Sequence, residues 1–461
     1  MPFEAAVEAL AALLGDRLSR SEAERRLHGQ NETWFPETPP DAVAWPISTE
    51  EVSKILAICH AYRMPVVAWG TGTSLEGHAL AVKGGLSLDL GRMDKVLEVR
   101  PEDMLAVVQP GVTREALNAD LRATGLFFPV DPGANASLGG MAATRASGTT
   151  TVRYGSMRDN VAALEVVLAD GTVIRTGSGA RKSAAGYDLT ALMLGSEGTL
   201  GIITELTLRL HGQPEAVSSA VCAFESFEAA VETVQMTIQM GIPMARIEFV
   251  DEQVARMFNA ANGTELPEKP HLMIEFHGSE QAVAEQSERF GEVVAEMGGA
   301  DFAWATTTED RNRLWKMRHG AYPACLAARP GCMGLVTDIC VPISRLAEAV
   351  AETRADIAEA GLQGPILGHV GDGNFHAILL LDRDDAEELA RAKTVAGRLA
   401  ERALRLGGTV TGEHGVGLGK RGYMEAEHGG GWQVMGAIKT ALDPLGILNP
   451  GKLVPSAETD A

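Results

Sequence analysis

Three long glycine-rich loops constrain the fold of this chain more than any other feature. The first, WGTGTSLEG at 69–77, follows a short apolar strand; the others are DPGANASLGGMAATRASGTTTVRYG at 131–155 and GSEGTLGIIT at 195–204. Loops of small residues let backbone N–H groups approach a phosphate closely. Neither a Rossmann G-x-G-x-x-G nor a Walker G-K-[ST] is present. Together the three loops suit a long ligand with a central pyrophosphate, whereas composition by itself favours three ordinary loops in a glycine-rich protein.

The pattern of apolar residues changes along the chain. Short strands and helices alternate over 49–212, whereas two units of strand followed by a long amphipathic helix come at 220–240 and 271–298. A length of 461 residues is too great for one hydrophobic core, so we expect two or three domains.

Composition excludes several classes of protein. A net charge of −21 would repel a nucleic acid. An odd number of cysteines without C-x-x-C argues against a disulfide framework or a zinc ribbon and fits a reducing compartment. The N-terminus MPFEAAVEALAALLGDRLSR has acidic interruptions and no basic start, which indicates an amphipathic helix rather than a signal peptide. No apolar run could span a bilayer. We expect a cytoplasmic protein, or one peripheral to the inner membrane.

The stretch LGHVGDGNFHAILL at 367–380 holds two histidines around a turn. Asp372-Gly373 is a strong signal for a two-residue type I′ turn between extended runs. Counting outward from that turn places His369 opposite His376, with Cβ atoms roughly 4.5–5.5 Å apart. Two imidazoles so placed could share one metal ion.

A third metal ligand would have to come from another element. The run TGEHGVGLGK at 411–420 offers Glu413 next to His414. Imidazole with carboxylate suits zinc, manganese or iron without choosing among them. Two facing histidines are more often hydrogen-bonded polar residues than ligands, so the residues alone leave both interpretations open.

Several long motifs in order resemble the FAD-binding domain of the vanillyl-alcohol oxidase/p-cresol methylhydroxylase superfamily: PVVAWGTGTSLEGHAL, VDPGANASLGGMAATRASGTTTVRYGSMRDNV, AAGYDLTALMLGSEGTLGIITE and LDPLGILNPGKL. The similarity continues through RHGAYPACLAARPGCMG, TDICVPISRL, GHVGDGNFH and TGEHGVGLGKR, which resemble the cytochrome-type D-lactate dehydrogenase branch of FAD-dependent D-2-hydroxy-acid dehydrogenases. The resemblance implies an α+β fold: a two-subdomain FAD-binding domain, and an α+β substrate (cap) domain with an antiparallel sheet. The expected parts are an N-terminal helical segment at 1–40, the FAD-binding domain at 41–212, the substrate domain with the metal hairpin at 213–410, and a segment completing the active site and FAD domain at 411–461.

The resemblance also implies that FAD is bound non-covalently. Its pyrophosphate is expected on Gly70, Thr71, Gly72, Thr73 and Ser74. The rest of the cofactor is expected to contact Pro132, Gly133, Gly139, Gly140, Ser147, Gly148, Tyr154, Glu197, Gly198, Gly201, Ile203 and, from the tail, Asn449. Some superfamily members attach flavin through a histidine, and His78 is the nearby candidate. Because this branch binds FAD non-covalently, we interpret His78 as an ordinary buried or surface residue.

The catalytic roles follow from the same resemblance. His369, His376 and Glu413 are implied to bind a divalent metal (zinc, manganese or iron), and His414 is implied to be the base. A Lewis-acid metal lowers the pKa of a substrate hydroxyl, and a neutral imidazole can then take its proton. Hydride would then pass from the substrate Cα to the flavin. His369 and His414 would both contact the substrate.

Substrate recognition is expected to involve one arginine and an apolar pocket. The resemblance places Arg318 at the position that binds the substrate carboxylate, which a guanidinium can do with two hydrogen bonds. From the residues alone it would be a surface arginine, and Lys316 and His319 are interpreted as solvated. D-2-hydroxyglutarate dehydrogenases carry Lys and Asn where this chain has Val336 and Ile378. Two apolar residues at these places disfavour a second carboxylate.

We therefore expect a flavin- and metal-dependent D-2-hydroxy-acid dehydrogenase of D-lactate type, with a small-molecule 2-hydroxy acid as substrate. Its electron acceptor would be a cytochrome, a quinone or an electron-transfer flavoprotein rather than NAD. The alternatives are a D-2-hydroxyglutarate dehydrogenase, a glycolate oxidase flavoprotein subunit, a metal hydrolase without flavin, and a non-catalytic flavin-binding subunit. A homodimer is the candidate assembly, with no nucleic-acid partner and no transmembrane segment.

Overall fold

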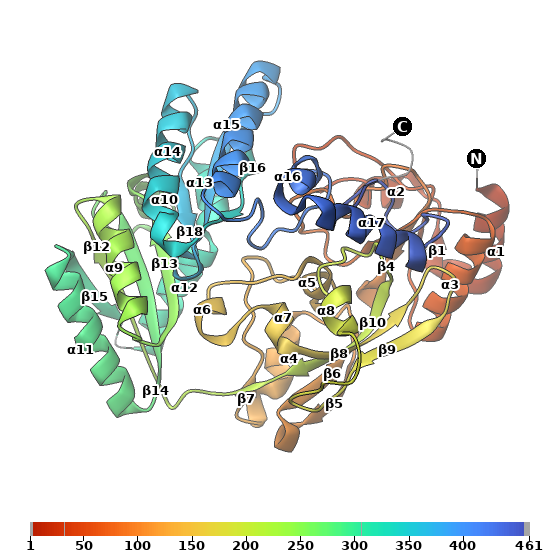
Figure 1. The fold of residues 1–461 in the computed structure, drawn as a ribbon, viewed down its shortest axis with the longest axis horizontal. Helices are drawn as coiled ribbons and strands as arrows, with labels where there is room; N and C mark the ends of the chain where they lie inside the picture. Colours follow the sequence, from red (N-terminus) through yellow and green to blue (C-terminus); the bar gives the residue numbers. More distant parts are fainter. Residues whose placement is uncertain (1–2, 32, 306, 456–461) are drawn as a thin grey trace. The chain divides into compact units, whose positions relative to one another are not determined.

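The computed structural model describes residues 3–31, 33–305 and 307–455, which form two compact units (Figure 1). Unit 1 consists of Met1–Ser147, Gly155–Gly212 and Glu413–Ala461. Unit 2 consists of Gly148–Tyr154 and Gln213–Gly412. The chain therefore passes from one unit to the other at four peptide bonds.

The first core of unit 1 surrounds a four-stranded sheet of order β1-β2-β4-β3. Its strands are β1 (Leu18–Ser19), β2 (Ala42–Ala44), β3 (Val66–Trp69) and β4 (Leu86–Asp89). Strands β2 and β3 both run parallel to β4. The helices of this part are α1 (Glu4–Leu14), α2 (Glu22–Leu27) and α3 (Thr49–Ala61). Leu10 of α1 and Leu56 of α3 are buried in the same apolar cluster as Val66.

The second core of unit 1 surrounds a five-stranded antiparallel sheet of order β5-β6-β10-β8-β9. Its strands are β5 (Val96–Arg100), β6 (Leu105–Val108), β8 (Val161–Val167), β9 (Val173–Gly177) and β10 (Ile202–Arg209). A separate two-stranded sheet pairs β7 (Leu126–Phe127) with β11 (His211–Gly212). The helices are α4 (Arg114–Asp120), α5 (Leu138–Thr144), α7 (Met157–Asn160), α8 (Leu189–Met193), α16 (Met424–His428) and α17 (Gly430–Leu442). Ile438 and Leu442 of α17 pack against this core, so the C-terminal segment completes unit 1.

Unit 2 is built on an eight-stranded antiparallel sheet. Its path is β15-β12-β14-β13-β18-β19-β16, and β17 also pairs with β19. The strands are β12 (Ala216–Ala223), β13 (Met244–Val250), β14 (His271–Gly278), β15 (Ala300–Ala305), β16 (Cys332–Val336), β17 (Ile339–Cys340), β18 (Ile366–Gly368) and β19 (Asn374–Asp382). The expected α+β fold class and the antiparallel sheet are confirmed.

The helices of unit 2 cover opposite faces of its sheet. On one face lie α9 (Phe227–Gln239) and α11 (Glu280–Glu296), because Phe227 packs against Phe249 of β13 and Phe290 against Phe276 of β14. Helices α14 (Leu346–Glu359) and α15 (Ala386–Arg405) lie side by side (Figure 1). On the other face lie α10 (Glu252–Asn262), α12 (Thr308–His319) and α13 (Ala321–Ala327), in one cluster with Val250. The short helix α6 (Thr151–Tyr154) lies near β13.

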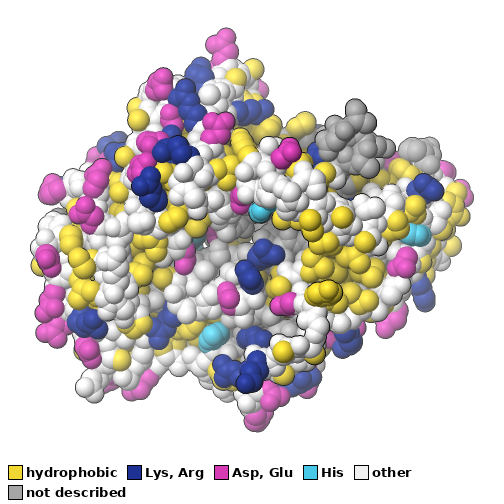
Figure 2. All heavy atoms as spheres, in the orientation of Figure 1, with side chains coloured by type: hydrophobic (Ala, Val, Ile, Leu, Met, Phe, Trp, Pro, Cys, Tyr) yellow, Lys and Arg dark blue, Asp and Glu magenta, His cyan; other side chains and the backbone are white. Residues whose placement is uncertain are grey.

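The surface is mixed in character. Figure 2 shows acidic and basic side chains interspersed over the visible face. Unit 1 also exposes apolar side chains, including Val434 of α17, Tyr187 and Leu189. Within the described part of the chain, no helix combines the length and the apolar character needed to cross a membrane.

Candidate active site

His369 and His376 approach one another in unit 2, but not through the predicted hairpin. The structure pairs His376 of β19 with Leu367 of β18, so the two histidines are not opposite each other. The prediction of a type I′ turn at Asp372-Gly373 is wrong. That turn needs positive φ at both central residues, whereas Gly373 has φ +79° and the three residues before it form a 3₁₀ turn. The rings still meet, with centroids 5.6 Å apart and planes at 84°.

Both histidine rings are fixed through the same nitrogen. His369 Nδ1 lies 2.7 Å from Glu248 Oε1, and His376 Nδ1 lies 3.0 Å from the carbonyl oxygen of Thr337. Because a carbonyl or a carboxylate oxygen only accepts, each Nδ1 carries a proton, and in the neutral imidazole Nε2 then carries the lone pair. Metal-binding histidines in proteins are held in this way, with the second nitrogen hydrogen-bonded to a carboxylate or a carbonyl. The pair therefore has the donor chemistry of metal ligands.

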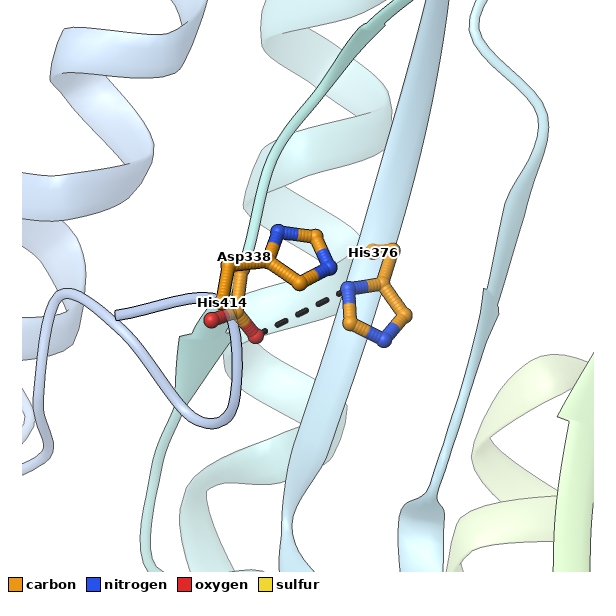
Figure 3. Close-up of side chains that lie close together, drawn as sticks. All are labelled: Asp338, His376 and His414. Atoms are coloured by element: carbon orange, nitrogen blue, oxygen red, sulfur yellow. Dashed lines mark ion pairs between the residues drawn. The ribbon is translucent and has the colours of Figure 1, made fainter. Parts of the chain in front are cut away.

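Asp338 is a fully buried carboxylate beside His376 (Figure 3). Its Oδ1 lies 3.7 Å from His376 Nδ1 and accepts a 2.7 Å hydrogen bond from Asn374 Nδ2. Its Oδ2 accepts a 2.7 Å hydrogen bond from Thr411 Oγ1. Asp338 thereby anchors the chain one residue before Gly412, where unit 2 ends and Glu413 follows.

Arg318 is buried rather than exposed, contrary to what its residue type alone suggests. It lies on α12, is only 6% exposed, and its Nη2 donates a 2.5 Å hydrogen bond to Glu248 Oε2. The Arg318 Nε–H is also buried and has no hydrogen-bond partner among the described residues. A buried donor of this kind needs an acceptor, and a ligand carboxylate would supply one. Of its neighbours, Lys316 is exposed and His319 is half-buried.

The loop that carries Glu413 and His414 is held within unit 1 by two side chains. Ser147 Oγ donates a 2.9 Å hydrogen bond to Glu413 Oε2. The buried Glu197 carboxylate accepts hydrogen bonds from the backbone N–H groups of Val416 (2.6 Å) and Gly417 (2.9 Å). Burial opposes ionisation of Glu197, but His78 and these two N–H groups together hold its pKa below the usual value. Glu197 therefore stays an anion that fixes the loop.

We predict that replacing Gly417 with alanine destabilises unit 1. Gly417 has φ +48°, and an added Cβ would lie 2.1 Å from the backbone oxygen of Glu76. The expected loss in the free energy of unfolding is about 1–3 kcal/mol, as for other strained backbone positions. Thermal unfolding should be compared with Gly422→Ala, where a Cβ would meet nothing within 4 Å. Equal midpoints for the two variants would contradict the loop geometry.

The three glycine-rich loops converge within unit 1. A Cβ at Gly70 would lie 2.3 Å from Ser137 Oγ, so the first loop touches the second. The backbone N–H of Glu197 in the third loop donates to the carbonyl of Ala143 in α5, at 2.9 Å. A Cβ at Gly198 would lie 3.7 Å from Ala68 of β3. This convergence of glycines is the geometry expected for closely approached ligand phosphates.

The residues assigned to FAD by resemblance fall mostly in this region. All lie in unit 1 except Gly148 and Tyr154, which belong to unit 2. Thr71 and Thr73 are exposed and their hydroxyl oxygens are 3.1 Å apart, so they can reach a ligand. Gly139 and Gly201 instead pack tightly, with added Cβ atoms 2.5 Å from Pro110 and Val166 respectively. The loops fit a dinucleotide, but at Gly139 and Gly201 close packing by itself also requires a glycine.

Other assigned residues use their side chains within the protein. Asn449 Nδ2 donates to the carbonyl oxygens of Glu197 (2.7 Å) and His78 (3.1 Å). His78 is buried, with Nε2 3.3 Å from Glu197 Oε1. Tyr154 hydrogen-bonds through its hydroxyl to His277 Nδ1 at 2.7 Å. Any contact of these residues with a cofactor stays a prediction.

Sequence reasoning missed three groups that shape the histidine pair. These are Glu248, the carbonyl of Thr337 and Asp338. One signal was available: in strand MARIEFV, which also carries the half-buried Arg246, Glu248 lies between Ile247 and Phe249 and is fully buried. A charge within a buried strand needs a partner, which points to a function.

Two protein families match this chain. The family described as "FAD binding domain" matches residues 40–177, and the family described as "FAD linked oxidases, C-terminal domain" matches residues 213–453.

Curated relatives match over nearly the full chain. "Probable D-lactate dehydrogenase, mitochondrial" of Danio rerio is 50% identical, covering 99% of this chain and 93% of that protein. "D-lactate dehydrogenase [cytochrome], mitochondrial" of Arabidopsis thaliana is 45% identical over 97% of this chain and 80% of that protein. The glycolate oxidase subunit GlcD of Bacillus subtilis is 36% identical over 94% of this chain and 93% of that protein.

Solved structures share the fold. The structure of p-cresol methylhydroxylase with substrate bound has a TM-score of 0.79 and 20% identity, covering 98% of this chain and 96% of that one. An alkyldihydroxyacetonephosphate synthase has a TM-score of 0.78 and 21% identity, covering 98% and 86%. At these identities the likeness concerns the fold alone.

Proposed function

The chain belongs to the FAD-linked D-lactate dehydrogenase family of oxidoreductases, and on that premise we propose that it oxidises a D-2-hydroxy monocarboxylic acid to the 2-oxo acid with the help of a divalent metal. Membership of this family and the matched FAD-binding domain leave no support for a metal hydrolase without flavin. D-Lactate is the substrate we favour, because relatives of 45–50% identity are named for it.

One observation carries the metal part of this proposal. His369 and His376 each donate from Nδ1 to the oxygen that holds them, so as neutral imidazoles both would direct a lone pair from Nε2. Glu413 would be the third ligand. It is joined by a single peptide bond to Gly412 of unit 2, so its Cα lies about 3.8 Å from that of Gly412 in any arrangement of the units. A set of imidazole and carboxylate donors suits zinc, manganese or iron.

The residues would divide the chemistry as follows. Arg318 would bind the substrate carboxylate through its guanidinium. His414, as a neutral imidazole, would take the proton of the 2-hydroxyl group while the hydrogen on Cα leaves with its electron pair. Bound FAD supplies the acceptor for that hydride, and the bound metal supplies a Lewis acid for the hydroxyl oxygen. FAD would be held non-covalently, as the family resemblance implies, and His78 lies buried with its Nε2 3.3 Å from Glu197 Oε1.

The size of the substrate would be set by an apolar corner of unit 2. Val336 of β16 and Ile378 of β19 are register partners in the sheet. Ile378 is buried in the cluster of α10, α12 and α13, and Val336 packs against that cluster. Ile378 follows His376 by two residues, so both side chains lie on one face of β19. An unpaired second carboxylate would be costly in such surroundings, which favours a short apolar acid over D-2-hydroxyglutarate.

The electron acceptor is proposed to be a cytochrome, since relatives of 37–45% identity carry that word in their names. A quinone or an electron-transfer flavoprotein is the alternative. The cytoplasmic location expected from the sequence stays a prediction, because these relatives are named as mitochondrial proteins. The homodimer likewise stays a prediction.

We predict a defined order of substrates in steady-state oxidation with an artificial electron acceptor. D-Lactate and D-2-hydroxybutyrate should be oxidised, L-lactate should not, and D-2-hydroxyglutarate should have a kcat/KM at least about 100-fold lower, since a buried unpaired charge costs several kcal/mol. Glycolate, which lacks a side chain, tests whether the protein is a glycolate oxidase subunit, as the name of the GlcD relative suggests. A preference for D-2-hydroxyglutarate would refute the apolar-corner assignment, and a preference for glycolate would favour the glycolate oxidase alternative.

A further inference from the structure

Glu248 is a buried carboxylate in the middle of unit 2 to which the family resemblance gave no role. It lies in β13 within the run MARIEFV and is 0% exposed. Its side chain lies on the same face as Val250, because strand residues two apart share a face. That face is covered by α12, which carries Arg318.

The two oxygens of Glu248 bind two different groups of the proposed active site. Oε2 accepts the 2.5 Å hydrogen bond from Arg318 Nη2, and Oε1 lies 2.7 Å from His369 Nδ1. The side chains of all three residues are nearly removed from solvent. A charge removed from water to this extent is kept only when geometry and hydrogen bonding are both good, and here the carboxylate satisfies one donor on each oxygen.

We propose that Glu248 is a positioning residue that sets the carboxylate-binding arginine and the metal-binding histidine at the same time. This inference rests on the proposed function. Through Oε1 it fixes the tautomer of His369 so that Nε2 can bind a metal. Through Oε2 it holds the Arg318 guanidinium, whose buried Nε–H has no hydrogen-bond partner among the described residues and is left for the substrate carboxylate. One side chain would thus fix the distance between the arginine that binds the substrate carboxylate and the histidine that binds the metal on the 2-hydroxyl group.

The substitution Glu248→Gln separates this role from a merely structural one. A glutamine has the same shape but one accepting oxygen and one donating NH₂ group. If its oxygen faces Arg318, the NH₂ group donates to His369 Nδ1 and moves the proton to Nε2, where it blocks the metal. If its oxygen faces His369, the NH₂ group opposes Arg318 and the guanidinium loses its anchor. Glutamine can therefore preserve one function but not both.

The matched control is Glu275→Gln on the neighbouring strand β14. Glu275 is also a buried carboxylate, and its Oε2 accepts hydrogen bonds from Ser219 Oγ at 2.7 Å and Trp315 Nε1 at 2.6 Å. Its Oε1 lies 2.8 Å from His277 Nε2. None of these partners is a proposed metal ligand or carboxylate binder, so the control loses a buried charge in the same sheet without removing a hydrogen bond of Arg318 or His369.

The experiment measures two quantities on the FAD-containing proteins. The affinity for zinc and for manganese is measured by competition with a chromogenic chelator, and KM and kcat for D-lactate are measured with the metal saturating. In Glu248→Gln we expect either the metal affinity to fall or KM to rise, by roughly 10- to 100-fold, as for other residues that hydrogen-bond to a metal ligand. In Glu275→Gln we expect neither quantity to change by more than about 3-fold, within the context dependence of such effects.

Three results would be decisive. Wild-type values of both quantities in Glu248→Gln, or equal losses in Glu275→Gln, would overturn the inference. If Glu248→Gln does not fold, Glu248→Asp replaces it: aspartate keeps both oxygens but is too short to reach both donors, and wild-type values there would also overturn it. The proposed function fails separately, if the wild-type protein binds no metal and Arg318→Met leaves KM unchanged.

Discussion

His376→Ala is expected to lose the bound divalent metal and the oxidation of D-lactate while it keeps FAD. His376 lies on β19, and its Nδ1 donates to the carbonyl of Thr337. Alanine has no imidazole, so the variant lacks the Nε2 lone pair that would bind the metal. Loss of a residue that hydrogen-bonds to a metal ligand lowers metal affinity by about 10- to 100-fold. Because His376 is the proposed ligand itself, we expect its loss to lower the affinity by more than about 100-fold. The glycine-rich loops belong to unit 1, so flavin absorbance should stay at one FAD per chain. Metal content by elemental analysis and turnover together check this prediction.

His271→Ala is the matched control for that variant. His271 is a buried histidine of β14 whose Nδ1 lies 2.7 Å from the carbonyl oxygen of Lys269, which repeats the backbone bond of His376. It is not a proposed ligand, so the control should keep its metal even if it is less stable. Full metal content together with normal turnover in His376→Ala would remove the ligand assignment.

His414→Ala is expected to keep both cofactors and lose the reductive half-reaction. Its neighbour Glu413 remains bound by Ser147, and the loop remains tied to Glu197 through the backbone of Val416 and Gly417. The missing imidazole removes the proposed proton acceptor, a loss that typically costs about 10²- to 10⁴-fold in rate. Flavin reduction by D-lactate, followed by stopped flow without oxygen, measures that rate directly.

His428→Ala controls for loss of any imidazole in the C-terminal segment. His428 is an exposed residue at the end of α16, and its removal should leave flavin reduction unchanged. Rapid flavin reduction in His414→Ala would contradict the role of His414 as the base. Slow reduction together with loss of the metal would indicate that His414 supports metal binding instead.

The turn at the histidine pair shows where reasoning from sequence reached its limit. Asp372-Gly373 has the composition of a two-residue turn, but Gly373 is used differently: an added Cβ would lie 2.0 Å from the carbonyl oxygen of Val341. The glycine is needed for close packing against the segment after β17, a contact between residues far apart in sequence. A residue-by-residue count cannot include such a contact, so the register was wrong although the two rings do meet.

The fold class and the glycine-rich loops were predictable because their signals are local. The apolar pattern predicted short strands and helices over 49–212 and strand–helix units at 220–240 and 271–298, and the structure has strands and helices in these regions. That the loops converge, with Gly70 against Ser137, depends on pairing between strands and was reached only through family resemblance.

The groups behind the site were not predictable from motifs. Glu248 and Asp338 stand in strand and loop segments whose burial depends on how the eight strands pair. Only the acidic residue between the apolar Ile247 and Phe249 hinted at Glu248. Motifs thus found the residues that would meet the substrate, while the residues that orient them required the three-dimensional structure.

The central claim is that flavin and a divalent metal act together on a D-2-hydroxy monocarboxylate. It is tested most directly by mixing D-lactate with the purified yellow protein without oxygen and following the flavin absorbance before metal removal, after chelation, and after zinc, manganese or iron is restored. We predict rapid bleaching that is lost on chelation and regained with one of these metals, and no bleaching by L-lactate at any stage. Bleaching that is equally fast in the metal-depleted protein would contradict the metal's role, and a fully metallated yellow protein that D-lactate does not bleach would contradict the proposed reaction itself.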